Sequence, residues 1–149
     1  MNQPRSLAEL MINDHERINK MFNDFKKEKN DFENAVRLFA EFSSELKKHI
    51  VVEDRITSSA MKKARGEREN LLPIASSLNI EHERILAKLA EMSSFLKKNR
   101  VPDSDGFFLM LRHHKNIEER LFYPKLDDIM EEKEKNEAIR IIRNIKSRT

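Results

Sequence analysis

The stretch HIVVED at residues 49–54 returns 65 residues later as HKNIEE at residues 114–119. Each copy begins with a histidine, places a glutamate four positions on, and follows that glutamate with another acidic residue. On a helix, residues four apart lie about 40° apart around the axis and one turn apart along it. Each stretch therefore predicts a helix that presents a histidine and a glutamate at the same point of one face.

Two further stretches carry one histidine each. DHERI at residues 14–18 returns as EHERI at residues 81–85, 67 residues later. Each half of the chain thus holds a segment with a single histidine, followed by a segment with His-x-x-x-Glu. Because an internal repeat indicates a repeated structural unit, we expect two helical hairpins that pack together as a pseudo-symmetric bundle.

Apolar residues recur at steps of three and four along four long segments, a pattern typical of helices that face the interior of a bundle. The expected helices cover residues 6–29, 31–65, 70–99 and 103–123 or beyond, with a shorter fifth helix at 131–148. Ser6 is expected to cap the first helix, and Asp103 or Ser104 the fourth. Gly66 is expected to end the second helix, and Pro124 to kink or end the fourth.

Four histidines and two glutamates occupy core positions of this pattern. The expected interior positions are Met11, His15, Ile18, Phe22 and Phe25; Phe32, Ala35, Phe39, Phe42, Leu46, His49, Glu53 and Ile56; Leu71, Ala75, Leu78, His82, Ile85, Leu89, Met92 and Leu96; and Phe107, Leu111, His114, Glu118 and Leu121.

The composition supports the same architecture, with two glycines and four prolines in 149 residues. We predict an all-α fold: an antiparallel, up-down four-helix bundle with a short C-terminal fifth helix. The whole chain, 1–149, is expected to form one metal-binding domain, with the bundle at about 6–130 and the last helix at about 131–148. Short connections make consecutive helices antiparallel neighbours.

Several classes of function are excluded by composition. With no cysteine, the chain has no disulfide framework, thiolate zinc finger or cysteine-held iron–sulfur cluster. No apolar run approaches the roughly 18 residues that span a bilayer, and the start does not resemble a signal peptide. The 29 basic and 26 acidic residues are mixed along the chain. We therefore expect a cytoplasmic protein that binds neither membrane nor nucleic acid, and its oligomeric state is left open.

The six polar residues predicted inside the bundle point to metal. A buried, unpaired carboxylate costs several kcal/mol, and two facing carboxylates repel each other. Cations resolve both problems, because imidazole and carboxylate suit iron, manganese and zinc. The predicted ligands are His15, His49, Glu53, His82, His114 and Glu118. A buried network of histidine–glutamate hydrogen bonds is the alternative.

The order His, His-x-x-x-Glu, His, His-x-x-x-Glu, together with the sequence around Glu118 that runs to Pro124, resembles the hemerythrin-like cation-binding (HHE) family. The resemblance covers residues from about 7 to 130. Ferritin-like di-iron bundles instead place the carboxylate first, in Glu-x-x-His. The resemblance implies two non-haem irons joined by an oxo or hydroxo bridge, with manganese or zinc as the alternatives.

Taken position by position, the resemblance implies that His15 and His49 hold one iron and that His82 and His114 hold the other. Glu53 and Glu118 would bridge the two irons.

The chain departs from the family at two places. Oxygen-carrying hemerythrins place a fifth histidine one turn before the ligand of the third helix, where this chain has Leu78. Residues 56–59, ITSS, replace the usual Leu-Phe-Pro ending of the first His-x-x-x-Glu frame. With four histidines, the pattern is more similar to the di-iron proteins that repair iron–sulfur clusters, although their cysteine-bearing domain is absent from this sequence.

Four other residues are ambiguous. His113 lies about 100° from the interior seam and is interpreted as a boundary or surface residue. Asp14 and Glu81 directly precede histidines, and either orient a ring N–H or face solvent. Tyr123 is interpreted as packing at a helix end, with a redox or hydrogen-bonding role as the alternative.

We expect a di-iron protein that binds O2, NO or peroxide in stress response or sensing. The first alternative is a di-iron enzyme for peroxide decomposition, NO reduction or iron–sulfur cluster repair. The second alternative is an iron-responsive interaction module or iron donor. The sequence does not decide whether the protein turns a substrate over.

Overall fold

The fold is seen in a computed structural model, which describes residues 6–62 and 66–146. The helices are α1 (Leu7–Lys27), α2 (Phe32–Met61), α3 (Leu72–Lys97), α4 (Asp105–Ile117), α5 (Tyr123–Ile129) and α6 (Glu132–Lys146), with a 3₁₀ turn at Gly66–Leu71 and a π-helical turn at Glu118–Phe122. These described residues include no strand, so the prediction of an all-α fold is confirmed.

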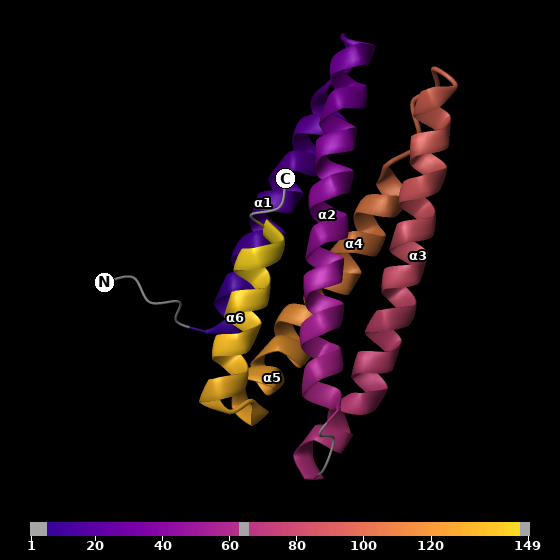
Figure 1. The fold of residues 1–149 in the computed structure, drawn as a ribbon. Helices are drawn as coiled ribbons and strands as arrows, with labels where there is room; N and C mark the ends of the chain where they lie inside the picture. The colour runs from indigo at the N-terminus through magenta and orange to yellow at the C-terminus, as the bar shows by residue number, and fades with distance from the viewer. Residues whose placement is uncertain (1–5, 63–65, 147–149) are drawn as a thin grey trace.

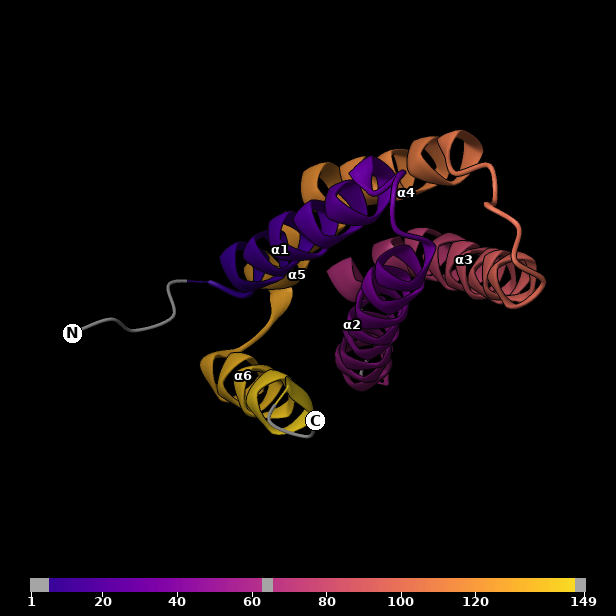
Figure 2. The ribbon, with the colours of Figure 1, turned by 90° about the horizontal axis from the view of Figure 1, so that it is seen from above.

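The bundle is closed by the fourth helix, which runs through α4, the π turn and α5. α1 packs against α2, α2 against α3, and α3 against α4, while α5 returns to α1 (Figure 1). α6 lies outside this ring against α2 and α1, as the view from above shows (Figure 2). The expected four-helix bundle with a short C-terminal helix is therefore confirmed.

Local interactions set the helix starts much as the sequence predicts. The Ser6 hydroxyl accepts the Glu9 N–H at 3.1 Å and caps α1. Ser104 occupies the N-cap of α4, but its side chain makes no cap bond. Instead, the carboxylate of Asp103 accepts the Asp105 N–H at 3.0 Å, so both predicted residues contribute to this start.

The connection between α2 and α3 differs from the prediction. α2 ends at Met61, and the expected extension to Arg65 falls on residues 63–65, which lie outside the described residues. Gly66 has a φ of 62°, a left-handed conformation that favours glycine, and it begins the 3₁₀ turn. This turn delays the start of α3 by two residues, and Pro73 lies in the first turn of that helix, where a proline is tolerated.

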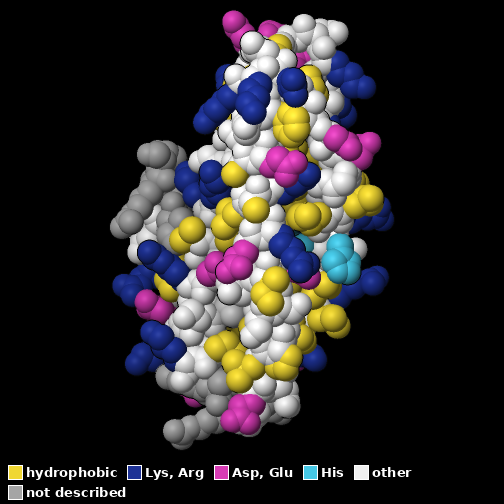
Figure 3. Space-filling model, turned by 90° about the vertical axis from the view of Figure 1, so that its right-hand side faces the viewer, with side chains coloured by type: hydrophobic (Ala, Val, Ile, Leu, Met, Phe, Trp, Pro, Cys, Tyr) yellow, Lys and Arg dark blue, Asp and Glu magenta, His cyan; other side chains and the backbone are white. Residues whose placement is uncertain are grey.

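The interior is divided into two hydrophobic clusters, one on each side of the polar residues. The first includes Phe22, Phe42 and Phe107, and the second includes Leu7, Leu78 and Tyr123. Outside the core, charges of both signs are mixed with hydrophobic side chains on the face shown in Figure 3. No described helix is both long and apolar enough to cross a membrane.

The interior positions of the fourth helix differ from the prediction at one point. Leu121, expected inside, is 49% exposed, and Phe122 and Tyr123 are buried instead. The cause is the π turn, in which the Tyr123 N–H donates to the Glu118 carbonyl five residues back. The extra residue in this turn shifts the buried face by one position or more.

Pro124 explains why the turn widens at this point. Proline has no N–H to donate to the carbonyl four residues earlier, and its ring clashes with that carbonyl in a regular α-helix. A wider turn relieves the clash. The predicted kink at Pro124 thus takes the form of a π-helical turn directly before it.

Candidate metal centre

All six predicted ligands meet in the middle of the bundle. They are buried, with His15 the most exposed at 8% and Glu118 the least at 0%. Their donor atoms form two groups, and within each group all atoms lie within 4.8 Å of one another. The first group is His15, His49, Glu53 and Glu118, and the second is Glu53, His82, His114 and Glu118. Both glutamates belong to both groups.

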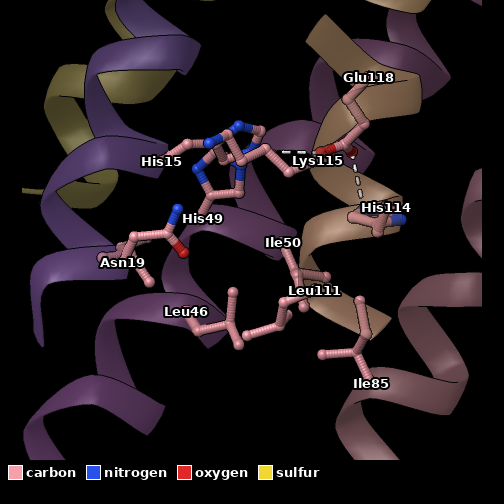
Figure 4. A pocket seen from close by; sticks show the side chains of 11 residues that line it. His15, Asn19, Leu46, His49, Ile50, Ile85, Leu111, His114, Lys115 and Glu118 are labelled. Carbon is pink, nitrogen blue, oxygen red and sulfur yellow. Dashed lines mark ion pairs between the residues drawn. The ribbon is translucent and has the colours of Figure 1, made fainter. Parts of the chain in front are cut away.

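The Nε2 atom of every histidine in the centre faces a glutamate. His114 Nε2 lies 2.9 Å from Glu118, and His15 Nε2 lies 3.2 Å from the other oxygen of the same carboxylate, the two contacts drawn in Figure 4. His82 Nε2 and His49 Nε2 lie 2.8 Å and 3.3 Å from the two oxygens of Glu53. Two histidines therefore converge on Glu53 and three on Glu118, since His82 Nε2 also lies 3.4 Å from Glu118. In each case one histidine lies on the same helix four residues earlier.

The Nδ1 atoms face outward to a second set of carboxylates. Each histidine contacts an acidic residue on a different helix: His15 with Glu119 at 2.7 Å, His49 with Asp14 at 2.8 Å, His82 with Asp54 at 2.8 Å, and His114 with Glu81 at 2.6 Å. A carboxylate at Nδ1 holds the proton there and leaves Nε2 free to face the centre.

Two of these four outer carboxylates, Asp14 and Glu81, were singled out from the sequence as residues that could orient a ring N–H. Asp14 and Glu81 do contact a ring nitrogen, that of the histidine on the following helix. The roles of Asp54 and Glu119 were missed. The sequence does contain a feature that could have identified them: each directly follows the glutamate of a His-x-x-x-Glu repeat.

Tyr123 has a larger role than the expected packing at a helix end. It is 1% exposed, its hydroxyl donates a hydrogen bond to Glu53, and the same oxygen lies 3.3 Å from His15 Nε2. Burial, with the negative charges of Glu53 and Glu118, raises the pKa of Tyr123 well above its usual value. The hydroxyl therefore remains a donor aimed into the centre.

Five buried polar atoms of the centre have no hydrogen-bond partner among the described residues: His49 Nε2, His82 Nε2, one oxygen of Glu53 and both oxygens of Glu118. His82 Nε2 lies 2.8 Å from Glu53 and 3.4 Å from Glu118, but neither contact has the geometry of a hydrogen bond. Unsatisfied buried polar atoms cost about 1–3 kcal/mol each, more when charged. Four imidazoles and two carboxylates are a donor set that suits iron, manganese or zinc, so a metal fits these atoms.

The pKa values show how the metal-free centre balances its charge. Burial alone would lower the pKa of His15, but its contacts with the carboxylates of Glu118 and Glu119 raise it to about 9. Burial likewise opposes the positive charge of His82, yet its carboxylate partners raise that pKa to about 12. The pKa values of His49 and His114 are also raised against their burial by carboxylate contacts. Without metal, protons on the histidines neutralise the buried glutamates.

The remaining residues singled out from the sequence lie outside the donor set. His113 is exposed on α4. Leu78 is buried one turn before His82, packed in the second hydrophobic cluster. The six residues are thus brought together as predicted, and their role as metal ligands stays a prediction.

Comparison with known proteins agrees with this geometry. A family model described as the hemerythrin HHE cation binding domain matches residues 6–126, which include both repeats and all six residues of the centre. No match was found among curated proteins or among solved structures.

Proposed function

The chain belongs to the hemerythrin HHE cation-binding domain family, and from this premise we propose that it is a non-haem di-iron protein that binds O2, NO or peroxide in stress response or sensing. Membership implies a metal-binding site, and the buried histidines and glutamates fit one. The observation that carries the proposal is the pair of four-residue groups that share Glu53 and Glu118. Two shared carboxylates suit two adjacent ions.

In this proposal His15 and His49 would hold one iron, His82 and His114 would hold the other, and the two shared glutamates would serve both. Each ion would receive two imidazoles and two carboxylate contacts, fewer than the six positions iron commonly uses. Bound iron would supply these open positions, and electrons, to a small ligand.

The residues around the centre orient its imidazoles, add a hydrogen-bond donor and limit the access of water. The four outer carboxylates hold each imidazole with Nε2 inward, which removes the rotational freedom that binding would otherwise have to restrict. Tyr123 adds a hydroxyl donor beside Glu53 and His15. The two hydrophobic clusters exclude bulk water from both sides.

Optical spectra of the anaerobically reduced, iron-loaded protein test the proposal. Addition of O2 and of NO should each produce new absorption bands, because both molecules would bind at the open positions. Recovery of a single zinc and no iron after anaerobic loading with ferrous iron would contradict the proposal, as would spectra that O2 and NO leave unchanged.

The enzyme alternative is favoured by one observation, the buried hydroxyl of Tyr123. A donor that keeps its proton inside a metal centre can deliver that proton to a reacting oxygen species. Stopped-flow measurement with peroxide separates the two functions. Repeated turnover that falls in Tyr123→Phe, at unchanged iron content, would favour an enzyme. A single stoichiometric reaction would favour binding.

A further inference from the structure

A small cavity lies against the centre on the side away from Tyr123. Its volume is about 30 Å³, which leaves room for a molecule of a few heavy atoms. His15, His49, His114 and Glu118 form one wall, and aliphatic side chains that include Leu46 and Leu111 form the other (Figure 4). A molecule in this cavity would touch the donor atoms of the centre directly.

The lining shows where the cavity meets solvent. Nine of its eleven lining residues are buried, and the two exceptions are Asn19 and Lys115, which are half-buried. Asn19 extends from α1 and Lys115 from α4, beside the imidazoles (Figure 4). The mouth of the cavity therefore lies at the seam between α1 and α4.

The internal repeat supplies a comparison within the same molecule. The 67-residue offset relates Asn19 to Leu86, and the 65-residue offset relates Lys115 to Ile50. Both counterparts are aliphatic, and Ile50 is 4% exposed. At these two positions the related seam between α2 and α3 carries apolar side chains, whereas the α1–α4 seam carries an amide and an ammonium.

The charge of Lys115 stands out among its surroundings. Outer carboxylates line each seam of the centre, and on the α1–α4 seam this residue is Glu119, one helical turn beyond Lys115. Within the described part of the chain, the Lys115 ammonium makes no ion pair. An approaching anion would therefore meet an unpaired positive charge at the mouth of the cavity, and the carboxylate on this seam, Glu119, is paired with His15.

We propose that the seam between α1 and α4 is the entrance to the centre, and that Lys115 and Asn19 at its mouth favour small monoanions of two or three heavy atoms. This inference rests on the proposed function and deepens it. Neutral diatomic molecules use the same entrance and gain nothing from the lysine charge.

The test is the association rate of azide with the iron-loaded full chain, measured by rapid mixing at low ionic strength. Lys115→Met should lower this rate by about threefold to tenfold, since a local charge steers a small anion toward a cleft. Added salt should slow the wild-type rate and have little effect on the variant. Nitric oxide, a neutral probe, should bind both proteins at the same rate.

Lys88→Met is the control, because it removes the same charge from a half-buried lysine of α3 that contacts Glu91 and lies outside the cavity. Its azide rate should equal that of the wild type. Asn19→Leu combined with Lys115→Ile copies the α2–α3 seam into this one and should slow both azide and nitric oxide.

Four outcomes would overturn the inference. An unchanged azide rate in Lys115→Met excludes charge selection, and an equal slowing of azide and nitric oxide in that variant does the same. If azide and nitric oxide bind the double variant at their wild-type rates, the seam between α1 and α4 is not the entrance. Each result is read at full iron content, whereas a wild-type chain that takes up no iron would overturn both the inference and the proposed function.

Discussion

At the scale of single residues, each histidine of the centre is held between carboxylates at both ring nitrogens. Glu53 or Glu118 faces Nε2, and an acidic residue from another helix contacts Nδ1. In the metal-free chain these contacts raise the pKa of His15 to about 9 although burial opposes the charge. Metal binding must displace such protons, so the same contacts that orient the rings also link the centre to pH.

Stability of the metal-free chain should fall as the pH rises. A histidine whose pKa is higher in the folded state stabilises the fold fully below its unfolded pKa, and loses that contribution as the pH rises through its folded pKa. For His15 this window runs from about 6.5 to about 9. The loss is at most about 3 kcal/mol for one such group. Urea denaturation with a chelator present measures it.

The iron-loaded chain is the control, and its pH dependence should have the opposite sign near neutrality. Ligation needs neutral imidazoles, so protons compete with the metal as the pH falls. A metal-free chain whose free energy of unfolding rises between pH 6.5 and 9 would contradict this account of the buried charges.

A substitution at Leu78 tests whether this position corresponds to the fifth histidine of oxygen-carrying hemerythrins. Leu78→His should place a fifth imidazole one turn before His82 and lengthen the lifetime of the oxygen adduct. Without metal, the buried imidazole should cost about 1–3 kcal/mol of stability. Leu78→Gln is the control, because it adds comparable polarity without an imidazole. An adduct lifetime that is unchanged in the histidine variant would show that residue 78 does not reach the metal.

At the scale of single elements, the π turn of the fourth helix has the largest effect on the centre. A regular helix would keep Leu121 on the inner face, as its three-four spacing predicts. The turn before Pro124 instead buries Phe122 and Tyr123 and brings the tyrosine hydroxyl to Glu53. The widened turn thus contributes a polar group that a regular helix would direct elsewhere.

Pro124→Ala should remove this effect. With an N–H at position 124 and no ring clash, the helix can continue in regular α form and turn Tyr123 away from Glu53. We expect a loss of about 1 kcal/mol, the scale of one hydrogen bond. Tyr123 is the sole tyrosine and the chain has no tryptophan, so its fluorescence reports this contact directly.

Emission should increase in the variant, because a carboxylate partner quenches tyrosine. Pro102→Ala, in the connection between α3 and α4, is the matched control and should leave the emission unchanged. If Pro124→Ala keeps the wild-type emission, the proline is not the cause of the turn.

At the scale of the whole molecule, the two halves form a pseudo-symmetric pair around the shared glutamates. The repeat offsets relate the contact between Asp14 and His49 to that between Glu81 and His114. The two halves differ where the repeat pairs Tyr123 with the exposed Ser58 and Lys115 with Ile50. These differences give the two groups of donor atoms and the two related seams different surroundings.

The sequence was sufficient for the features that depend on local periodicity. Steps of three and four located the helices. The His-x-x-x-Glu repeats located four of the six central residues, and the single-histidine repeats located His15 and His82. The position of Tyr123 could not be predicted, because the periodicity argument assumes 3.6 residues per turn and the π turn breaks that period. Asp14 and Glu81 were singled out because each adjoins a histidine in the sequence. Glu119 and Asp54, the partners of His15 and His82, adjoin no histidine and meet one only through the packing of the helices.

Anaerobic titration with ferrous iron tests the central claim, that the six residues hold two ions between them. The wild-type chain should bind about two irons, and His114→Ala, which removes a ligand of one group, should bind about one. His113→Ala changes the exposed neighbour and should still bind about two irons. A wild-type chain that saturates at one iron, or a loss of iron in His113→Ala equal to that in His114→Ala, would contradict the account.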